Sequence, residues 1–175
     1  MVHERDWEMA ELETKLRAEV RGEESALEAD ALEGYLASRT LRDLALEVMN
    51  QGDELHVEIP SQKWRGVVDH VGDDFFRLIA TNRDVVAVRL GGGVALRRLE
   101  LAPAGGRSRS LGPKKFVALL RQLMMEERLV ELHGSWGTST PGAIKAVAPD
   151  HVLALSGESE AFLPLDHIDA VVELA

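Results

Sequence analysis

The chain has 175 residues, a formal net charge of -10 at pH 7 and no cysteine. This length allows one good core or two small ones, and the lack of cysteine excludes disulfides and thiolate zinc sites. The first residues, MVHERDWEMAELETK, contain no apolar signal core, and no later apolar run approaches the length of a membrane span, so we expect a cytoplasmic protein without membrane association.

Residues 1–39 form an acidic segment rich in Glu, Ala and Leu, a composition that favours helix. Gly22 interrupts the apolar spacing, and SALE at 25–28 has the form of a capping box that restarts a helix. We therefore expect two helical stretches, or one helix kinked near Gly22. The acidic helix is also the predicted contact for a protein partner.

Residues 40–101 have the pattern of one helix followed by five strands. TLRD at 40–43 is a second capping box, and apolar residues then recur at helical spacing up to Val48. ELHVEIP, WRGVVDHV, DFFRLIAT, DVVAVRL and VALRRLEL follow, each short, rich in β-branched residues and bounded by turn residues. This segment is the first predicted domain.

Residues 102–112, APAGGRSRSLG, form a linker rich in Gly, Ser and Arg. Residues 113–175 then repeat the pattern of the first domain. Pro113 suits the first turn of a helix with an apolar stripe, and five short strand patterns follow: LVELHGS, PGAIKAV, HVLALSG, AFLPL and IDAVVEL. The sequence therefore predicts a second domain with the same order of elements.

The two domains also match residue by residue. Four matches are separated by 76 positions, and a fifth by 75, which places a one-residue length difference in a loop. The matched pairs are Gly66 with Gly142, Val68 with Ile144, Val71 with Val147, Asp74 with Asp150, and Leu90 with Leu165. A shared order of elements together with these matches indicates an internal duplication.

The repeated unit, a short helix and five short strands with glycine in the second and an acidic residue near the start of the third, resembles the Sm-like small-barrel family. The resemblance covers residues 41–101 and 113–175, and glycine permits the sharp bend that closing such a sheet needs. It implies an α+β, mainly β chain with two tandem five-stranded Sm-like or SH3-type small barrels, each preceded by a short helix, plus the amino-terminal helix.

Assembly and RNA binding are separate implications of this resemblance. Sm-like barrels usually join edge to edge, because open strands present unpaired backbone groups. We therefore expect the two barrels to pack through edge strands or to leave those edges for a second copy, which makes a homo-oligomer an expected state. The uridine-binding aspartate position of the family holds Gly72 and Ala148 here, so an RNA pocket does not follow from the resemblance.

Basic residues are concentrated in the middle of the chain. Residues 51–115 hold 11 Lys and Arg against 8 Asp and Glu, whereas residues 1–50 hold 6 against 13 and residues 116–175 hold 3 against 9. A positive stripe with Trp64 as a platform for a stacked base would suit single-stranded nucleic acid. Its candidate residues are Lys63, Trp64, Arg65, Arg97, Arg98, Arg107, Arg109, Lys114 and Lys115. The alternative is a solvated face with Trp64 half buried in the barrel wall.

Catalytic and metal chemistry have weaker support. DHVGDD and DHID hold histidine beside carboxylates, but aspartate is common in turns because it bonds its own backbone. GSWGTSTPG lacks the spacing of a nucleophile elbow. We therefore expect no catalytic residue, metal or cofactor. The predicted function is a non-catalytic binding or regulatory protein that contacts RNA or DNA through the first barrel and linker, or alternatively a protein-interaction or oligomerisation module.

Overall fold

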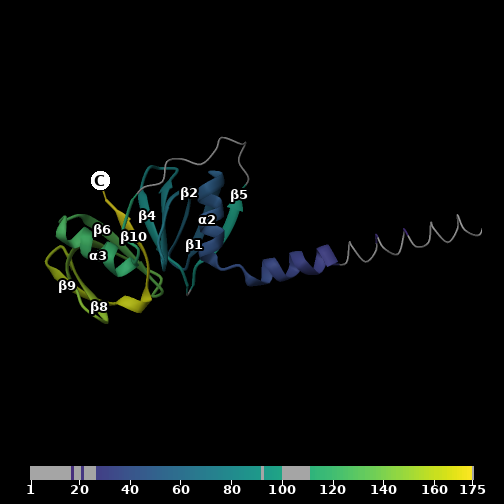
Figure 1. Cartoon of the computed structure of the whole chain (residues 1–175). Helices are drawn as coiled ribbons and strands as arrows, with labels where there is room; N and C mark the ends of the chain where they lie inside the picture. Colours follow the sequence, from purple (N-terminus) through teal and green to yellow (C-terminus); the bar gives the residue numbers. More distant parts are fainter. Residues whose placement is uncertain (1–16, 18–20, 22–26, 92, 100–110, 175) are drawn as a thin grey trace, which may run out of the picture. The chain divides into compact units, whose positions relative to one another are not determined.

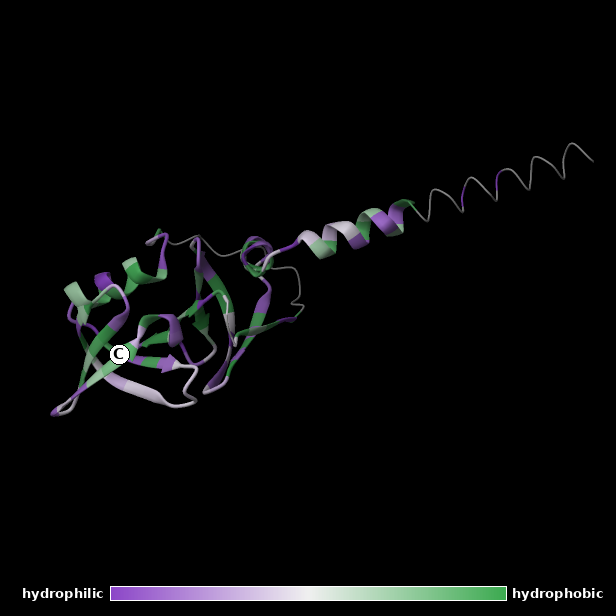
Figure 2. Ribbon diagram, turned by 90° about the horizontal axis from the view of Figure 1, so that it is seen from below, coloured by the Kyte–Doolittle hydropathy of each residue, from purple (hydrophilic) through white to green (hydrophobic). Residues whose placement is uncertain are grey.

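The computed structural model describes residues 17, 21, 27–91, 93–99 and 111–174 (Figure 1). The chain divides into two compact units, Met1–Arg39 and Thr40–Ala175. In the first unit residues 27–38 are helical, as predicted, and this helix carries both hydrophobic and hydrophilic residues (Figure 2). The predicted break near Gly22 lies outside the described residues. No helix among the described residues is long and apolar enough to cross a membrane.

The second unit contains one order of elements twice, as the duplication predicts. The first half consists of α2 (Leu41–Gln51), β1 (Glu54–Ile59), β2 (Gln62–Val71), β3 (Phe75–Ala80), β4 (Val85–Arg89) and β5 (Ala95–Leu99). The second half consists of α3 (Phe116–Met125), β6 (Leu129–Gly134), β7 (Ser139–Val147), β8 (His151–Ser156), β9 (Ser159–Pro164), a short 3-10 helix (Leu165–His167) and β10 (Ile168–Glu173).

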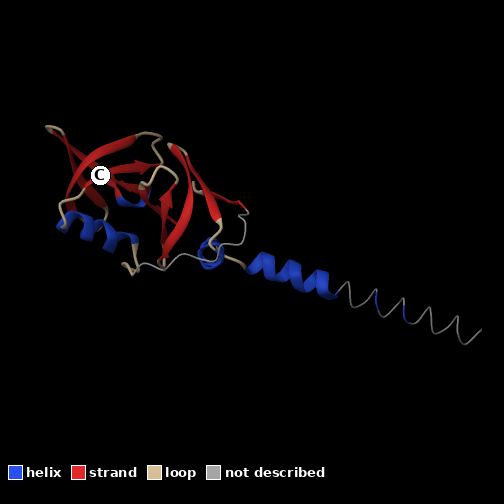
Figure 3. Ribbon diagram, turned by 90° about the horizontal axis from the view of Figure 1, so that it is seen from above, coloured by secondary structure: helices blue, strands red, loops and turns tan. Residues whose placement is uncertain are grey.

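All ten strands belong to one antiparallel sheet with the order β5-β1-β2-β3-β4-β10-β6-β7-β8-β9. The strands curve strongly (Figure 3). Each half has the same internal order, which confirms the predicted equivalence of the two units. The prediction of two separately closed barrels is wrong: β4 pairs with β10 of the other half, so the sheet is continuous and open. The pairing of β4 with β10, hereafter the joint, confirms the prediction that the halves pack through edge strands.

The repeated glycines lie where neighbouring strands approach each other closely. A Cβ on Gly66 in β2 would overlap the backbone carbonyl oxygen of Ile79, and a Cβ on Gly142 in β7 would overlap that of Leu155. A register shift follows both glycines at the same distance, between Val68 and His70 in β2 and at the matching place in β7. Glycine and the irregularity together allow each half to bend.

The joint contributes to both hydrophobic cores. Val86 and Val88 of β4 and Ala170 and Val172 of β10 belong to the core of the first half. The alternate residues Ala87 and Val171 belong to the core of the second half, as does Ile168, which is separated from Ala170 by a register shift. Because side chains alternate between the two faces of a strand, one pair of strands completes both cores. The joint is therefore part of the fold and not a loose contact between domains.

The helices α2 and α3 begin differently. Thr40 and Asp43 form the predicted capping box of α2, in which the Thr40 hydroxyl accepts from the Asp43 N–H. Lys115, at the N-cap of α3, makes no such side-chain bond. The first half supplies the cap instead: the Phe116 N–H donates to Asp74 Oδ1 over 2.7 Å. The turn between β2 and β3 therefore holds the start of the other half's helix.

Candidate functional site

Two of the predicted basic residues form ion pairs across the first hairpin. Lys63 Nζ lies 2.7 Å from Glu58 Oε1, and the guanidinium of Arg65 pairs with Glu54. The hydrogen bond from Lys63 lowers the pKa of Glu58, so that carboxylate stays charged beside it. These partners reduce the positive potential that β2 presents to a phosphate.

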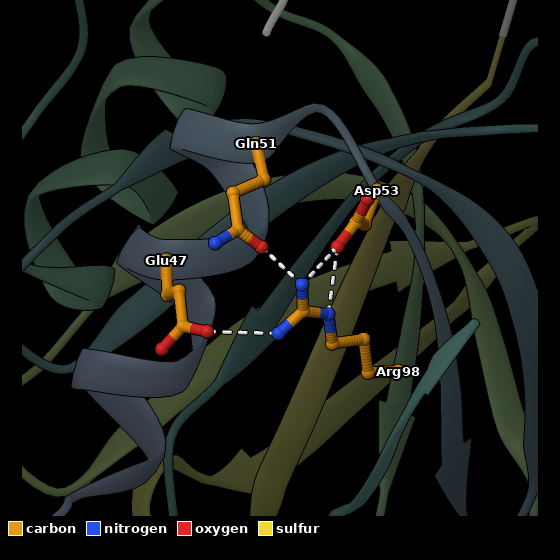
Figure 4. A network of polar contacts seen from close by, with 4 residues as sticks. All are labelled: Glu47, Gln51, Asp53 and Arg98. Carbon is orange, nitrogen blue, oxygen red and sulfur yellow. Dashed lines mark hydrogen bonds and ion pairs between the residues drawn. The ribbon is translucent and has the colours of Figure 1, made fainter. Parts of the chain in front are cut away.

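Arg98 has a structural role (Figure 4). Its Nε donates to Asp53 Oδ2 over 2.6 Å and its Nη1 donates to Glu47 Oε1 over 2.8 Å, while Nη2 reaches the side-chain oxygen of Gln51. The hydrogen bond with Asp53 raises the pKa of Arg98. Arg98 thus fastens the edge strand β5 to α2, and two acidic groups already neutralise its charge.

Trp64 lies in the core of the first half, with 7% of its surface exposed. Its ring meets His133 of β6 edge-on, with the ring centroids 5.1 Å apart. This burial agrees with the alternative interpretation of Trp64 as a structural residue. Little of its ring is exposed to solvent, so a nucleic-acid base could hardly stack on it. The contact also helps to hold the two halves together.

The remaining predicted residues are exposed or lie outside the described part of the chain. Arg97 is exposed on β5, and Lys114 and Lys115 are exposed immediately before α3 in the other half. Arg107 and Arg109 fall outside the described residues. Of the seven predicted residues that the structure describes, Arg65 and Arg97 lie in one row, both opposite His56 of β1.

His133 and Asp169 are buried polar groups near the joint. Ser61 Oγ lies 3.2 Å from His133 Nδ1, whereas His133 Nε2 and Asp169 Oδ2 have no hydrogen-bond partner among the residues that the structure describes. Burial lowers the pKa of His133 and raises the pKa of Asp169. Glu131 lies 3.7 Å from His133 Nε2, beyond hydrogen-bonding distance. This serine–histidine contact is partly buried and joins the two halves, so it is better placed to hold them than to activate a nucleophile.

The sheet ends in two strands that pair on one side only. Within the described sheet, β5 pairs with β1 and β9 pairs with β8, and these strands form its two outer edges. An outer edge presents unpaired backbone N–H and C=O groups. Phe162 of β9 is 63% exposed, and its ring lies tilted against that of His151, with the ring centroids 5.8 Å apart. A strand with one open edge can accept a further strand, and an exposed aromatic residue on it can contact the side chains of that strand.

Backbone hydrogen bonds establish which residues are equivalent in the two halves. The Leu90 N–H donates to the Asp74 carbonyl over 2.7 Å, and the Leu165 N–H donates to the Asp150 carbonyl over 2.8 Å. After each helix, the Asp53 N–H donates to the Val48 carbonyl and the Arg128 N–H to the Leu123 carbonyl. The equivalent positions lie 76 or 75 residues apart, as the sequence repeat predicts.

Residues that are buried at the joint have equivalents elsewhere in the chain that are exposed or half-buried. Phe75, Ala87 and Phe116 are all buried in the core of the second half, and Phe75 and Phe116 contact each other across the two halves. Their equivalents, found at the same offsets, are His151, Phe162 and Leu41. Phe116 is 1% exposed whereas Leu41 is 39% exposed. The residues that one half covers at the joint are uncovered at the two outer edges.

No protein-family model matches this chain, and no curated protein is significantly similar to it in sequence. The structure defines an α+β protein built on one open, ten-stranded antiparallel sheet whose halves have the same strand order.

Proposed function

We propose that this chain is a non-catalytic binding protein whose ligand is polypeptide, bound at the outer edges β5 and β9. The joint is the observation that carries the proposal. At the joint, the β4 edge of one half accepts the β10 edge of the other, and β9 and β5 are the strands equivalent to β4 and β10. Addition of a strand to an exposed edge is a recurrent mode of polypeptide recognition.

The strand order supports a finer assignment. Each half has its fifth strand beside its first, followed by the second, third and fourth, and each second strand carries a bend-permitting glycine. We assign both halves as Sm-like units on these features. In this assignment the open edges are the surfaces available for binding, and the interiors of the two halves serve only as cores.

The basic residues favour polypeptide over nucleic acid as the ligand. Lys63, Arg65 and Arg98 each form an ion pair with a carboxylate, so binding of a phosphate there would compete with existing partners. Nucleic acid is the second candidate because Lys114 and Lys115 are adjacent and exposed. Its affinity would depend steeply on salt, since phosphate contacts release counterions.

The test compares an edge variant with a matched surface variant. Phe162→Lys places a charge on the outer edge, whereas Met125→Lys changes an exposed apolar residue, 73% exposed, on α3. Tagged wild type and both variants are used to capture partners from extracts of the protein's own cells, and protein and nucleic acid are quantified. We expect Phe162→Lys alone to lose most of the captured polypeptide.

Equal recovery of polypeptide by all three proteins would contradict the proposal. Recovery of nucleic acid that falls with salt and with Lys114→Ala/Lys115→Ala, but not with Phe162→Lys, would instead establish the second candidate. Both lysines contribute about 0.7 each to the slope of log K against log salt if they contact single-stranded phosphates, so the double variant would be shallower by about 1.4.

A further inference from the structure

We propose that a pH-sensitive contact holds the tip of the β1–β2 hairpin against the second half, and that adding a proton to His133 releases this tip. The tip consists of residues 60–64, and the contact of Ser61 and Trp64 with His133 is hereafter the latch. The inference goes beyond the proposed function, because it concerns a contact between the halves and not the outer edges. The joint stays paired when the latch opens.

The latch is a second contact between the halves, separate from the joint. Ser61 Oγ is 3.2 Å from His133 Nδ1, across 72 positions of sequence, and the Trp64 ring meets the imidazole edge-on with the centroids 5.1 Å apart. The joint consists of β4 and β10, whereas the latch consists of the β1–β2 turn, β2 and β6. One contact can therefore open while the other remains closed.

A neutral imidazole suits the closed latch better than a charged one. His133 is 4% exposed, and its Nε2 has no hydrogen-bond partner in the described part of the chain. A neutral ring has a single N–H, and with this proton on Nδ1 it donates to Ser61 Oγ. A protonated ring has a second N–H, on Nε2, and a positive charge. Protonation thus buries a charged donor that the closed latch leaves unpaired, which costs free energy.

Glu131 is the acidic group that faces the imidazole. Its Oε2 lies 3.7 Å from His133 Nε2, and its carboxylate also accepts a hydrogen bond from Ser139 of β7. Burial lowers the pKa of His133 and Glu131 raises it, and the effect of burial is the larger. Glu131 therefore favours the protonated ring but does not keep it stable while the latch is closed.

The strands on either side of β6 place uncharged residues directly opposite His133. These neighbours are Ser139 in β7 and Ala170 in β10. Asp169 precedes Ala170 in β10 and is nearly buried. The charged groups that lower its pKa are those of His167 and Arg89, so Asp169 belongs to a different group of interacting charges.

The charged side chains of the hairpin face away from the latch. Lys63 and Arg65 alternate with the buried Trp64 along β2, so they lie on the other face of the strand. Glu58 and Glu54 of β1 pair with them there. These four charges compensate one another on that face, which leaves burial as the main determinant of the protonation of the latch.

The hairpin tip, and not β6, is the part that moves. Hydrogen bonds to β10 and β7 hold β6 on both sides. The tip is the end of a hairpin, and an open hollow of about 600 Å³ lies beside it, lined by hairpin residues together with Gly93 and Ala95. Movement of the tip into this space brings water to His133 and ends its contact with Trp64.

Acid should open the latch. In the open form His133 is in water, where its ordinary pKa is 6.5, and in the closed form its pKa is lower. The open form therefore binds the proton better than the closed form does. Between the two pKa values the ratio of open to closed molecules rises about tenfold for each pH unit of acidification.

The experiment uses Trp64 as the reporter. The chain has three tryptophans, and Trp7→Phe combined with Trp136→Phe leaves Trp64 alone. Its emission and its quenching by acrylamide are measured as the pH is lowered from about 7.5 to about 4.5, and hydrogen exchange of the β4 and β10 amides, corrected for intrinsic rates, is followed in parallel. We expect a red shift and stronger quenching below the ordinary pKa, with the joint still protected.

Two variants assign the proton to His133. His133→Gln keeps a side chain that hydrogen-bonds but takes no proton in this range, so its Trp64 emission should stay constant. Glu131→Gln removes the charge that favours the protonated ring, so the transition should shift to lower pH. This second variant changes a partly exposed side chain, and it decides the question even if His133→Gln does not fold.

Three results would overturn the inference. The first is Trp64 emission and quenching that do not change until the β4 and β10 amides also lose protection, which would mean that the sheet unfolds as a whole. The second is the same transition in His133→Gln. The third is a Glu131→Gln transition at an unchanged or higher pH, because another group would then take the proton.

Discussion

Phe162 occupies the position in β9 that Ala87 occupies in β4, yet Phe162 is 63% exposed whereas Ala87 is 3% exposed. The cause is the joint: Ala87 belongs to the core that β10 and α3 help to form, and within the described part of the chain no equivalent strand and helix cover Phe162. The chain thus contains the same strand edge twice: β4 is paired with β10 at the joint, and β9 has no neighbour on that side in the described sheet.

Both repeated glycines should be intolerant of substitution. Gly66→Ala and Gly142→Ala each place a Cβ against a neighbouring backbone carbonyl, which only a strand movement can relieve. We expect each variant to lower the free energy of unfolding by about 1–3 kcal/mol, measured by urea denaturation. Gly34→Ala is the control, because a Cβ there has open space and the residue is helical. A loss at one repeated glycine only would contradict the equivalence of the halves.

Each half contains an ion pair at equivalent positions, but the acidic and the basic residue are exchanged between the halves. Asp53 pairs with Arg98 in the first half, and at equivalent positions Arg128 pairs with Glu173 in the second. Arg98→Ala should lower the free energy of unfolding by about 1–3 kcal/mol, because it leaves the nearly buried Asp53 unpaired. Arg128 is more exposed, so Arg128→Ala should cost below about 1 kcal/mol.

Exchanging the charges of the Asp53–Arg98 pair tests whether the two ion pairs are interchangeable. Arg98→Glu alone should destabilise strongly, since it adds a carboxylate beside Asp53 and Glu47. Asp53→Arg combined with Arg98→Glu reproduces the polarity of the second half and should recover part of the loss. A double variant no more stable than Arg98→Glu would show that the polarity is not interchangeable.

Asp74 should matter for stability where its equivalent Asp150 does not. Asp74→Ala removes the acceptor for the Phe116 N–H at the start of α3, and loss of a helix cap costs about 1 kcal/mol. Asp150 is highly exposed and bonds the neighbouring His151, so Asp150→Ala should have little effect on chemical denaturation. Equal losses in the two variants would argue against a capping role for Asp74.

Acidification should destabilise the chain through His133. Burial lowers the pKa of His133 below its ordinary value of 6.5, so between these two pKa values the unfolded chain binds more protons than the folded chain. Stability is therefore complete above the ordinary pKa and decreases as pH falls toward the lowered one. His133→Phe should flatten the pH dependence of the unfolding free energy in this window. An unchanged slope would exclude His133 as its source.

Asp169 changes the pH dependence of stability in the opposite direction, at lower pH. Burial raises its pKa above the ordinary value of 3.8, so between the two values the folded chain binds more protons than the unfolded chain. Stability from this group is present below the ordinary pKa and is lost as pH rises through the raised one. Asp169→Asn should remove this decrease with pH, as denaturation curves at several pH values would reveal.

Local features of the fold were predictable from the sequence. The capping box at Thr40 and the strand alternation depend on residues close together in the chain, and the 76-residue repeat correctly indicated equivalent strand orders. The burial of Trp64 also had a local signal, because it alternates with Gly66 and Val68 on the buried face of β2.

Nonlocal pairings were not predictable in the same way. Side-chain alternation determines which face of a strand is buried, but not which neighbour takes its free edge, so the sequence did not distinguish closed barrels from a continuous sheet. The partners of Arg98 lie 45–51 residues away in the chain, and nothing in the local pattern identifies them. The exposure of Phe162 is explained only by comparison with its equivalent Ala87, which the joint covers.

Capture of polypeptide by the purified chain tests the role of the outer edges most directly. Wild type and Met125→Lys should recover the same polypeptides from extracts of the protein's own cells, and Phe162→Lys, which places a charge on the outer strand β9, should lose most of them. Equal recovery by all three proteins would contradict the proposed function.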